Sequence, residues 1–412
     1  MSFKTICVIG LGYIGLPTAA VFASRKVSVI GVDISQHAVD TINRGKIHIV
    51  EPDLDILVHA TVKEGFLSAT TKPEKADAFV MAVPTPFKGE DHEPNLDYIE
   101  SATRALAKVL EKGNLVVLES TSPVGATEKM AAWLAEERPD LTFPQDAGED
   151  SDIRIAHCPE RVLPGHILRE LVENDRIIGG LTPKCTELAS QLYKIFVEGA
   201  CIATNARTAE MSKLTENASR DGQIAFANEL SVLCDKMDID VWELISLANR
   251  HPRVNILQPG CGVGGHCIAV DPWFIVNQFP NDALMIKAAR ETNDGKPLFV
   301  ISKVEQAAKD IKNPKIACLG LAFKPDIDDL RESPALEITK LLSDNARFTI
   351  LAVEPNVKEL PPVLSNRKNV ALSSLENSLE EADVVVVLVK HKEFIGLTAE
   401  KSILDFVNSC NQ

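Results

Sequence analysis

The chain has 412 residues, of which 45% are hydrophobic and 25% charged, and this composition predicts a globular protein of two or three domains. Its formal net charge of −15 argues against nucleic acid or an anionic membrane as a partner, because phosphate-rich surfaces are bound by basic protein surfaces. The nine cysteines are odd in number and irregularly spaced, which predicts free thiols in a reducing compartment rather than a disulfide framework.

The N-terminus shows no pattern of a secretory signal, and no apolar run approaches the length of a membrane span, so we expect a cytoplasmic protein. Residues 4–9 predict a strand and residues 16–24 a helix, with Gly10-Leu11-Gly12-Tyr13-Ile14-Gly15 between them. A second predicted strand, residues 27–32, ends in Asp33. A GxGxxG motif in this setting predicts a dinucleotide-binding Rossmann unit, and a plain β-turn-α unit without a ligand is the alternative.

Each residue of this motif has a predicted role. Gly10 forms the tight turn, Gly12 lets the backbone approach the pyrophosphate at the helix N-terminus, and Gly15 permits close packing. Asp33 accepts a hydrogen bond from the adenosine ribose in such units. Because a carboxylate repels a 2′-phosphate, the predicted cofactor is NAD rather than NADP.

The α/β alternation continues with three more predicted strands, residues 78–83, 115–119 and 153–157. Loops after parallel strands lie at the C-terminal edge of the sheet, where ligands bind. Three threonines in the loops after the first two strands are candidate cofactor contacts, with helix capping as the alternative: Thr85, Thr121 and Thr127. Residues 139–152 predict a polar surface loop, and the third strand leads into a turn, residues 158–165, that contains Glu160 and Arg161.

A proline-free helix is predicted over residues 206–235. Four polar side chains recur on one of its faces at helical spacing: Glu210, Lys213, Asn217 and Arg220. A solvated charged face is the alternative reading of this stripe. A second predicted helix, residues 241–249, precedes the loop Arg250-His251-Pro252-Arg253-Val254-Asn255, which places positive charge in an otherwise acidic protein.

A glycine-rich run follows this basic loop, Gly260-Cys261-Gly262-Val263-Gly264-Gly265-His266-Cys267, and Asp271 comes four residues after the second thiol. The glycines allow the backbone to fold closely around a ligand, and a thiol presented near a carboxylate is typical of a nucleophile. Buried structural cysteines are one alternative. A zinc site from Cys261, His266 and Cys267 is another, although the run lacks the paired spacing of structural zinc sites.

The last third of the chain predicts a second Rossmann-like unit. A helical segment over residues 282–309, interrupted near Pro297, leads to residues 315–320, which repeat the strand-then-glycine opening of the N-terminus. The strand over residues 348–353 ends in Glu354, as the earlier one ends in Asp33. Two apolar segments, residues 383–389 and 403–407, predict the remaining inner strands. The loop of this unit lacks GxGxxG, which suits a different phosphate-bearing ligand.

With these motifs the chain resembles the UDP-glucose/GDP-mannose dehydrogenase family over essentially its whole length. Residues 82–87, 158–165 and 251–273 are similar to the branch of the family that acts on UDP-N-acetylhexosamines. The glucose branch has Phe-Pro-Lys-Asp after the catalytic cysteine, whereas this chain has Ile268-Ala269-Val270-Asp271. The resemblance implies a four-electron, NAD-dependent oxidation of a sugar C6 alcohol to a carboxylate, through a thiohemiacetal and a thioester on Cys267.

The resemblance also implies a fold, a set of domains and an assembly. It implies an α/β protein with an N-terminal NAD-binding Rossmann domain, a central helical linking and dimerisation domain, and a C-terminal UDP-sugar-binding Rossmann-like domain. We predict their boundaries at residues 1–203, 204–303 and 304–412. We expect a homodimer or a higher homo-oligomer without a metal.

Three groups of site residues follow from the resemblance. The catalytic group is Cys267, Lys213, Asn217, Asp271 and Glu160. The group that binds the UDP-sugar is Arg161, Val162, Lys213, Asn217, Arg220, His251, Arg253, Gly264 and Lys324. The cofactor group includes Tyr13, Ile14, Asp33, Thr85, Thr127 and Arg331, and for Arg331 a surface salt bridge to its acidic neighbours is the alternative.

Two rival functions share parts of this pattern. A two-electron hydroxyacid dehydrogenase has the first domain and a catalytic lysine, but it needs neither Cys267 nor a third domain. A non-enzymatic NAD-binding paralogue is disfavoured because Cys267, Lys213, Asn217 and Asp271 are all intact. Within the family, UDP-N-acetylglucosamine and UDP-glucose are alternative substrates.

Overall fold

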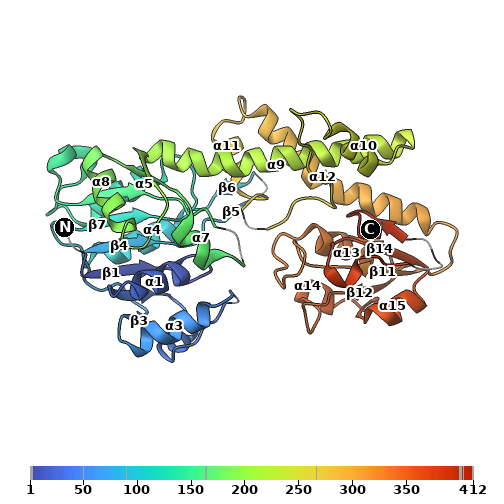
Figure 1. Ribbon diagram of the computed structural model, residues 1–412, viewed down its shortest axis with the longest axis horizontal. Coiled ribbons are helices and arrows are strands. Elements are labelled where there is room, and N and C mark those ends of the chain that lie inside the picture. Colours follow the sequence, from blue (N-terminus) through green and yellow to red (C-terminus); the bar gives the residue numbers. More distant parts are fainter. Residues whose placement is uncertain are drawn as a thin grey trace. The chain divides into compact units, whose positions relative to one another are not determined.

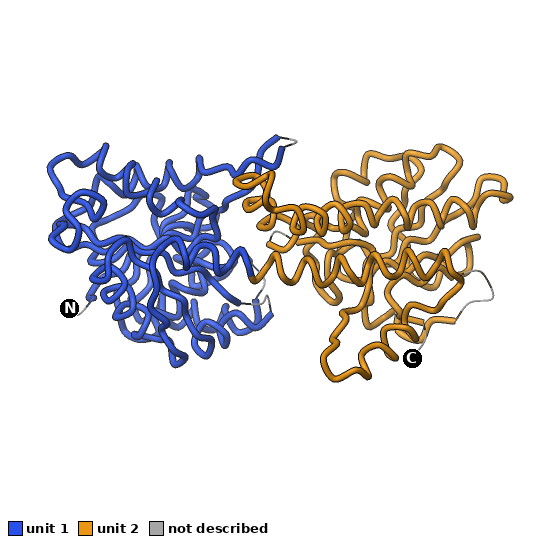
Figure 2. Tube along the Cα trace, turned by 90° about the horizontal axis from the view of Figure 1, so that it is seen from above, with its two compact units in different colours: residues 1–215 blue, residues 216–412 orange. Residues whose placement is uncertain are grey.

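The computed structural model describes residues 3–49, 51–89, 91–162, 165–265, 267–398, 401 and 403–410. The chain divides into two compact units, residues 1–215 and residues 216–412 (Figure 2). The division falls within the long helix α9 (Ala206–Met237), which agrees with the predicted proline-free helix. The predicted boundaries of three domains remain predictions.

Unit 1 is built on one sheet with the strand order β10-β9-β8-β7-β4-β1-β2-β3 (Figure 1). Its strands are β1 (Thr5–Ile9), β2 (Ser28–Val32), β3 (Leu67–Thr70), β4 (Ala78–Met81), β7 (Leu115–Leu118), β8 (Arg154–His157), β9 (Arg176–Gly180) and β10 (Cys201–Asn205). Neighbouring strands are parallel except for the antiparallel pair β8 and β9. A separate hairpin pairs β5 (Phe87–Lys88) with β6 (Glu93–Pro94).

Helices pack on both faces of this sheet. They are α1 (Gly15–Ser24), α2 (Gln36–Asn43), α3 (Leu54–Lys63), α4 (Asp97–Ala107), α5 (Ala126–Glu137), α6 (Pro144–Ala147), α7 (Ile167–Glu173) and α8 (Pro183–Tyr193). Ile6 and Val8 of β1 belong to the core beneath α1 and α8, whereas Cys7 and Ile9 belong to the core beneath α4 and α5. Burial on both faces explains why the central strands β1, β4 and β7 are almost entirely apolar in sequence.

The prediction of a polar loop over residues 139–152 is wrong in part, because α6 lies within it. Phe143 is 1% exposed and anchors the start of this short helix. Pro144 occupies the first helical position, where its fixed φ angle suits the helix and its missing N–H costs no hydrogen bond. Side-chain burial therefore fixes a segment whose composition is that of a loop.

Unit 2 contains the rest of α9, three further helices and a second sheet. The helices are α10 (Val241–Ala248), α11 (Asp271–Gln278) and α12 (Leu284–Ala307). The sheet is parallel throughout, with the order β13-β12-β11-β14-β15. Its strands are β11 (Lys315–Leu319), β12 (Thr349–Val353), β13 (Val370–Leu372), β14 (Val384–Val387) and β15 (Ile403–Asp405), and its helices are α13 (Pro334–Asp344), α14 (Pro362–Ser365) and α15 (Leu375–Glu381).

The two sheets open in the same way, so the predicted second Rossmann-like unit is confirmed. The amide of Gly10 donates to the carbonyl of Val32 at 2.8 Å, and that of Gly320 to the carbonyl of Val353 at the same distance. The prediction of two inner strands holds for β14 but is wrong for β15, which lies at the edge of the sheet. Its residues pack against the core from there, so an apolar sequence did not distinguish an inner from an edge strand.

The predicted interruption near Pro297 is also wrong, because α12 is continuous through that residue. A proline removes the hydrogen bond to the carbonyl four residues earlier, here that of Asn293, at a cost of roughly 3 kcal/mol. Pro297 and Val300 are both buried, so tertiary packing holds the helix across this turn. The carbonyl oxygen of Asn293 lies against the glycine-rich run, 3.1 Å from where a Cβ of Gly262 would be.

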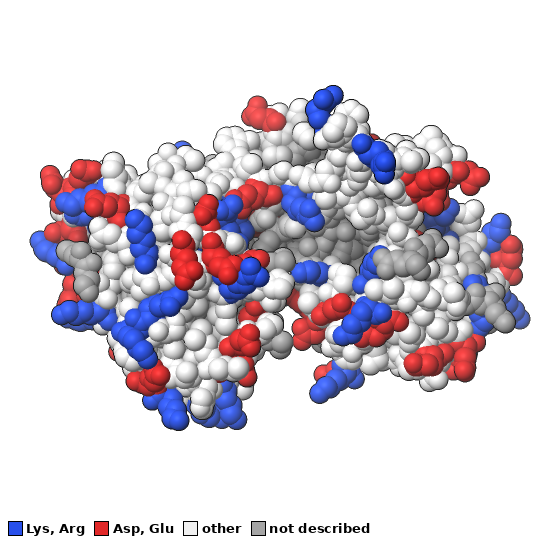
Figure 3. Space-filling view, in the orientation of Figure 1, with Lys and Arg blue, Asp and Glu red and all other residues white. Residues whose placement is uncertain are grey.

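None of the described helices combines the length and the apolar character that crossing a membrane requires. On the face drawn in Figure 3, Lys and Arg side chains are interspersed with Asp and Glu side chains. The predicted lack of a nucleic-acid partner stays a prediction.

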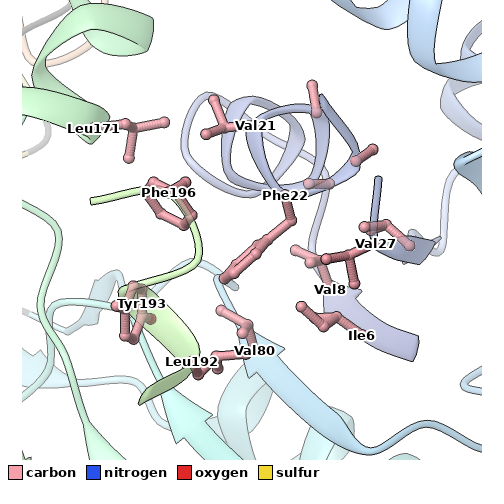
Figure 4. Close-up of a cluster of buried hydrophobic side chains, with 14 of the residues drawn as sticks. Ile6, Val8, Val21, Phe22, Val27, Val80, Leu171, Leu192, Tyr193 and Phe196 are labelled. Carbon is pink, nitrogen blue, oxygen red and sulfur yellow. The ribbon is translucent and has the colours of Figure 1, made fainter. Parts of the chain in front are cut away.

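Replacing Phe22 of α1 tests how much core packing contributes to the stability of unit 1. Its fully buried ring lies among Val8, Val80, Tyr193 and Phe196 (Figure 4), with its centroid 4.7 Å from that of Phe196. We expect Phe22→Ala to lower the free energy of unfolding of unit 1 by about 3–5 kcal/mol, because it leaves a cavity. Urea unfolding followed by Trp133 fluorescence, with Trp242 and Trp273 replaced by Phe, measures this loss.

The control for that measurement is Ile56→Ala, because Ile56 is in the same unit but is 66% exposed. Its expected effect is within about 0.5 kcal/mol. Equal losses in the two variants would contradict the assignment of Phe22 to the core.

Candidate active site

The start of α1 can hold the pyrophosphate of a dinucleotide. This helix has no side-chain cap and no acidic residue in its first turn, so its N-terminal amides face no competing carboxylate. A Cβ on Gly12 would meet nothing within 4 Å, whereas a Cβ on Gly15 would lie 1.7 Å from the carbonyl oxygen of Gly10. Gly12 therefore leaves open space above the amides, and Gly15 allows close packing, as the motif predicts.

The surroundings of this loop fit NAD. The carboxylate of Asp33 accepts hydrogen bonds from the amides of Leu11 at 3.0 Å and Ser35 at 2.8 Å, which fixes it at the end of β2. The hydroxyl oxygens of Thr85 and Ser122 are buried and have no hydrogen-bond partner among the described residues. Such oxygens suit contact with a bound ligand. Three further candidates are partly buried around the same loops: Tyr13, Ile14 and Thr121.

Thr127 is hydrogen-bonded to a residue of α9. Its hydroxyl donates to Glu210 of α9 at 2.6 Å, and the same carboxylate accepts the amides of Gly125 at 2.7 Å and Thr127 at 2.8 Å. Burial raises the pKa of Glu210, and these hydrogen bonds oppose that rise. Glu210 thus occupies the N-terminus of α5, and the contact of Thr127 with a cofactor stays a prediction.

The polar stripe of α9 is only partly a solvated face. Glu210 is 1% exposed and Lys213 is 8% exposed, although Arg220 is exposed. Glu160 is also buried in unit 1, and burial raises its pKa to about 7 against the opposing charges of Lys213 and Arg176. A carboxyl group that titrates near neutral pH suits a general base.

The turn after β8 is held from several sides. The amide of Val162 donates to Glu160, and the guanidinium of Arg161 donates to the carbonyl of Asp175 at 3.1 Å. Glu51 accepts the amides of Gly165 at 2.9 Å and Ile167 at 2.8 Å. The turn therefore presents Glu160, Arg161 and Val162 from a fixed backbone.

In unit 2 the structure brings together three of the predicted catalytic residues. The carbonyl of Cys267 accepts the amides of Val270 at 3.0 Å and Asp271 at 2.8 Å, so this partly exposed residue lies one turn before α11. Asp271 is 3% exposed, and its carboxylate accepts a hydrogen bond of 2.5 Å from the amide of Asn217. A position before a helix N-terminus favours an anion, whereas the carboxylate of Asp271 in the first turn of α11 opposes one.

The two cysteines of the glycine-rich run differ. Cys261 lies in the apolar core beneath α12 and α13, and burial raises its pKa to about 12, so it fits the structural alternative. Cys267 does not lie in that core. The zinc hypothesis also involves His266, which lies outside the described residues.

The run packs closely against the loop after β11. A Cβ on Gly264 would lie 2.4 Å from the carbonyl oxygen of Glu332, and the amide of Gly265 donates to the carbonyl of Arg331 at 3.2 Å. The guanidinium of Arg331 pairs with Asp329 at 2.5 Å, as in the salt-bridge alternative. Lys324 is partly exposed on the same loop, and the predicted ligand contacts of Arg331 and Lys324 stay predictions.

The basic loop after α10 is closed by Asn249. Its side chain accepts from the amide of Ile256 at 2.7 Å and donates to the carbonyl of Ile256 at 3.0 Å. His251 and Arg253 are exposed on this loop, and the guanidinium of Arg253 carries positive charge of the kind that binds a phosphate.

Several buried polar residues that shape the site had no signal in the sequence. Glu51 is far from the turn it binds, and no spacing relates it to residues 165–167. Glu119 pairs with Arg176 at 3.6 Å and accepts from Tyr193 at 3.2 Å in the interior of unit 1. These partners are far apart in the sequence, and only the folded chain brings them together.

Comparison with known proteins bears on the whole chain. Three models of the UDP-glucose/GDP-mannose dehydrogenase family match it: the NAD binding domain at residues 4–197, the central domain at residues 207–295 and the UDP binding domain at residues 317–411. A UDP-N-acetyl-D-mannosamine dehydrogenase from Campylobacter jejuni is 72% identical over 402 residues, which cover 97% of this chain and 98% of that protein.

Two other similarities extend this comparison. An NDP-N-acetyl-D-galactosaminuronic acid dehydrogenase from Ralstonia nicotianae is 64% identical over 401 residues, covering 97% of this chain and 94% of that protein. The solved structure of a UDP-D-ManNAc dehydrogenase from Pyrococcus horikoshii superposes with a TM-score of 0.87 at 40% identity, covering 98% of this chain and 95% of that one. On the fold, the matched domains and these identities, the chain belongs to the UDP-glucose/GDP-mannose dehydrogenase family.

Proposed function

We propose that the protein oxidises the C6 alcohol of UDP-N-acetyl-D-mannosamine to the carboxylate, with two NAD as hydride acceptors. The observation that carries this proposal is the group formed by Cys267, Asp271 and Asn217 in unit 2. A two-electron alcohol dehydrogenase has no use for a thiol beside its site, whereas a four-electron oxidation needs one to hold the aldehyde. The 72% identical relative supports the choice of sugar.

One alcohol, two NAD and one water give one carboxylate, two NADH and three protons. NAD, when bound, supplies the acceptor for each hydride. The glycine loop before α1 would hold its pyrophosphate and Asp33 its ribose, with Thr85 and Thr121 as further contacts.

The first oxidation requires a base and a cation near C6. We propose that Lys213, acting as acid and base, accepts the proton of the hydroxyl group while a hydride leaves the carbon. Negative charge develops on the oxygen in this step, and an ammonium and an amide donor stabilise it. Lys213 and Asn217 are one helical turn apart on α9, which suits joint action on one oxygen.

The second oxidation proceeds through the thiol. The thiolate of Cys267 adds to the aldehyde carbon and forms a thiohemiacetal, from which the second hydride leaves to give a thioester. Water then adds to the thioester carbon, the C–S bond breaks, and the thiolate is released with the carboxylate. Glu160 and Asp271 are the carboxyl groups proposed to activate and position that water.

The diphosphate of the substrate requires local positive charge in an acidic protein. Exposed or partly exposed cations are available for it: Arg161, Arg220, Arg253 and Lys324. The other proposed contacts are His251, Val162 and Gly264. An arginine fits a phosphate through two parallel hydrogen bonds, so we assign the diphosphate chiefly to the arginines.

The name of the Ralstonia relative makes a nucleoside-diphosphate (NDP) N-acetyl-D-galactosamine derivative the second candidate substrate. The test measures NADH formed per sugar consumed, with the mannosamine, galactosamine and glucosamine derivatives and UDP-glucose in parallel. We expect two NADH per UDP-N-acetyl-D-mannosamine. One NADH per sugar, or turnover of another sugar alone, would contradict the proposal.

In the same assay we expect Cys267→Ser to lower uronate formation by roughly 10³-fold or more, because the nucleophile is lost. NAD binding, measured by fluorescence titration, should be unchanged because Cys267 is not among the predicted cofactor contacts. Cys410→Ser, at another partly exposed cysteine, is the control and should be fully active. An active Cys267→Ser enzyme would exclude the covalent route.

A pH profile tests the role of Glu160. Its pKa of about 7 means that the carboxylate forms as the pH rises through neutrality, so kcat should rise over this range. In Glu160→Gln this rise of kcat with pH should disappear, and kcat should fall by roughly 10²–10⁴-fold, as loss of a general base does. The control is Glu173→Gln, at an exposed residue of α7. If kcat of Glu160→Gln still rose with pH through neutrality, the rise would belong to another group.

We also propose a homodimer through α9 and α10. Phe226, Leu233 and Met237 are exposed at spacings of seven and four residues on α9, and Leu247 is 63% exposed on α10. Such a stripe suits a second copy of the same helices. We expect the double variant Phe226→Glu/Leu233→Glu to reduce the mass found by light scattering to that of one chain, whereas Val363→Glu should not. Unchanged mass in both would contradict this interface.

A further inference from the structure

We propose that a buried polar network behind the glycine-rich run positions the Cys267 thiol for attack. The network consists of Asp221 and Asn228 of α9 with Arg290 and Asn293 of α12, and we call it the thiol-loop network. The inference deepens the proposed function and rests on it, because it assigns positioning residues to the same nucleophile.

The centre of the thiol-loop network is a buried ion pair. Arg290 donates to one carboxylate oxygen of Asp221 at 2.5 Å, and the side-chain amide of Asn293 donates to that same oxygen at 2.8 Å and to the carbonyl of Asp221 at 3.1 Å. These three side chains are at most 1% exposed. Arg290 also pairs with Asp294, which is half exposed.

From this centre the network reaches both ends of the run that carries the thiol. Asn228, which is fully buried, donates to the side-chain oxygen of Asn293 at 2.8 Å and accepts the amide of Gly260 at 2.8 Å. On the other side, Arg290 lies 3.5 Å from the carbonyl oxygen of Ile268, the residue after Cys267. The backbone is therefore tied to α9 and α12 before and after the nucleophile.

Donor and acceptor can be assigned for each hydrogen bond that links Gly260 to Asp221 through the two asparagines. The backbone amide of Gly260 can only donate, so Asn228 must present its oxygen there and its NH₂ group to Asn293. Asn293 must then present its own NH₂ group to Asp221, which as a carboxylate only accepts. A carboxylate at position 221 thus sets the orientation of two amides in sequence, and Arg290 balances its charge.

Burying these polar groups costs desolvation free energy, so we interpret the network as fixing the geometry of the glycine-rich run. A buried ion pair contributes little net stability, and an apolar replacement of equal volume is often as stable. A run with four glycines, by contrast, has many accessible backbone conformations, and the hydrogen bonds to Gly260 and Ile268 restrict them. Because a displacement of about 1 Å of a reacting group costs on the order of 10²-fold in rate, this restriction matters for the thiol.

The test uses Asn228→Ala, which removes the acceptor of the Gly260 amide and the donor to Asn293. Its matched control is Asn114→Ala in unit 1, because Asn114 is a buried asparagine that also accepts a backbone amide, that of Glu111 at 2.8 Å, and donates to a backbone carbonyl. Both variants lose similar hydrogen bonds, but only the first touches the thiol-loop network. Three quantities are measured: kcat, the NAD dissociation constant, and the alkylation rate of Cys267 by iodoacetamide, followed by mass spectrometry.

We expect Asn228→Ala to lower kcat by roughly 10–100-fold. It should slow alkylation of Cys267 at pH 7.5 by roughly fivefold, since the displaced thiol is no longer held in the position from which it attacks. The NAD dissociation constant should stay within about twofold. Asn114→Ala should leave all three quantities near those of the wild type.

Two results would overturn the proposal: wild-type alkylation and kcat in a folded Asn228→Ala protein, or equal changes in both variants. Should Asn228→Ala fail to fold, Arg290→Lys is judged by the same criteria, since it keeps the charge toward Asp221 but loses the fork that also reaches Ile268. The alkylation readout does not depend on the substrate. A wild type that oxidises no sugar, combined with altered alkylation in the variant, would therefore reject the proposed function and retain the positioning role.

Discussion

The loops of this protein depend on one recurring interaction, a carboxylate that accepts backbone amides where a strand or turn ends. Carboxylates that do this in different places include Asp33, Glu51, Glu210 and Glu354. Burying a carboxylate is costly unless its oxygens are well satisfied, and charge-assisted bonds from amides satisfy them. Each loop is thereby held in one conformation at the edge where ligands bind.

The two Rossmann-like sheets use this interaction with different consequences. Asp33 binds the amides of Leu11 and Ser35 and remains partly exposed. Glu354, which follows β12, binds the amides of Leu321 and Ala322, and its other contacts include the ring of His391 at 3.0 Å. Burial alone would raise the pKa of Glu354, but the hydrogen bonds from His391 and the amides hold it at about 2. An acid so fully engaged suits a loop that binds something other than a dinucleotide ribose.

The long helix α9 carries several of the polar residues that make these contacts. Glu210 ties its start to the N-terminus of α5, Lys213 approaches Glu160 in unit 1, and Asn217 binds Asp271 in unit 2. Farther along, Asp221 and Asn228 reach the glycine-rich run through α12. Residues of α9 therefore take part in polar contacts within each unit, which explains why polar side chains recur along this helix.

The sequence by itself determined the parts whose signals are local. The GxGxxG loop, Asp33, the repeated opening at Gly320 and the spacing of Lys213 and Asn217 follow from periodicity and turn chemistry, and the structure places them as expected. Only the tertiary structure decided the continuity of α12 through Pro297, the edge position of β15 and the burial of Glu210. It also decided the pairing of Asp221 with Arg290, which are 69 residues apart. The physical reason is that burial and hydrogen-bond partners of a polar residue depend on neighbours distant in the chain, and no local pattern encodes which of them the packed helices bring together.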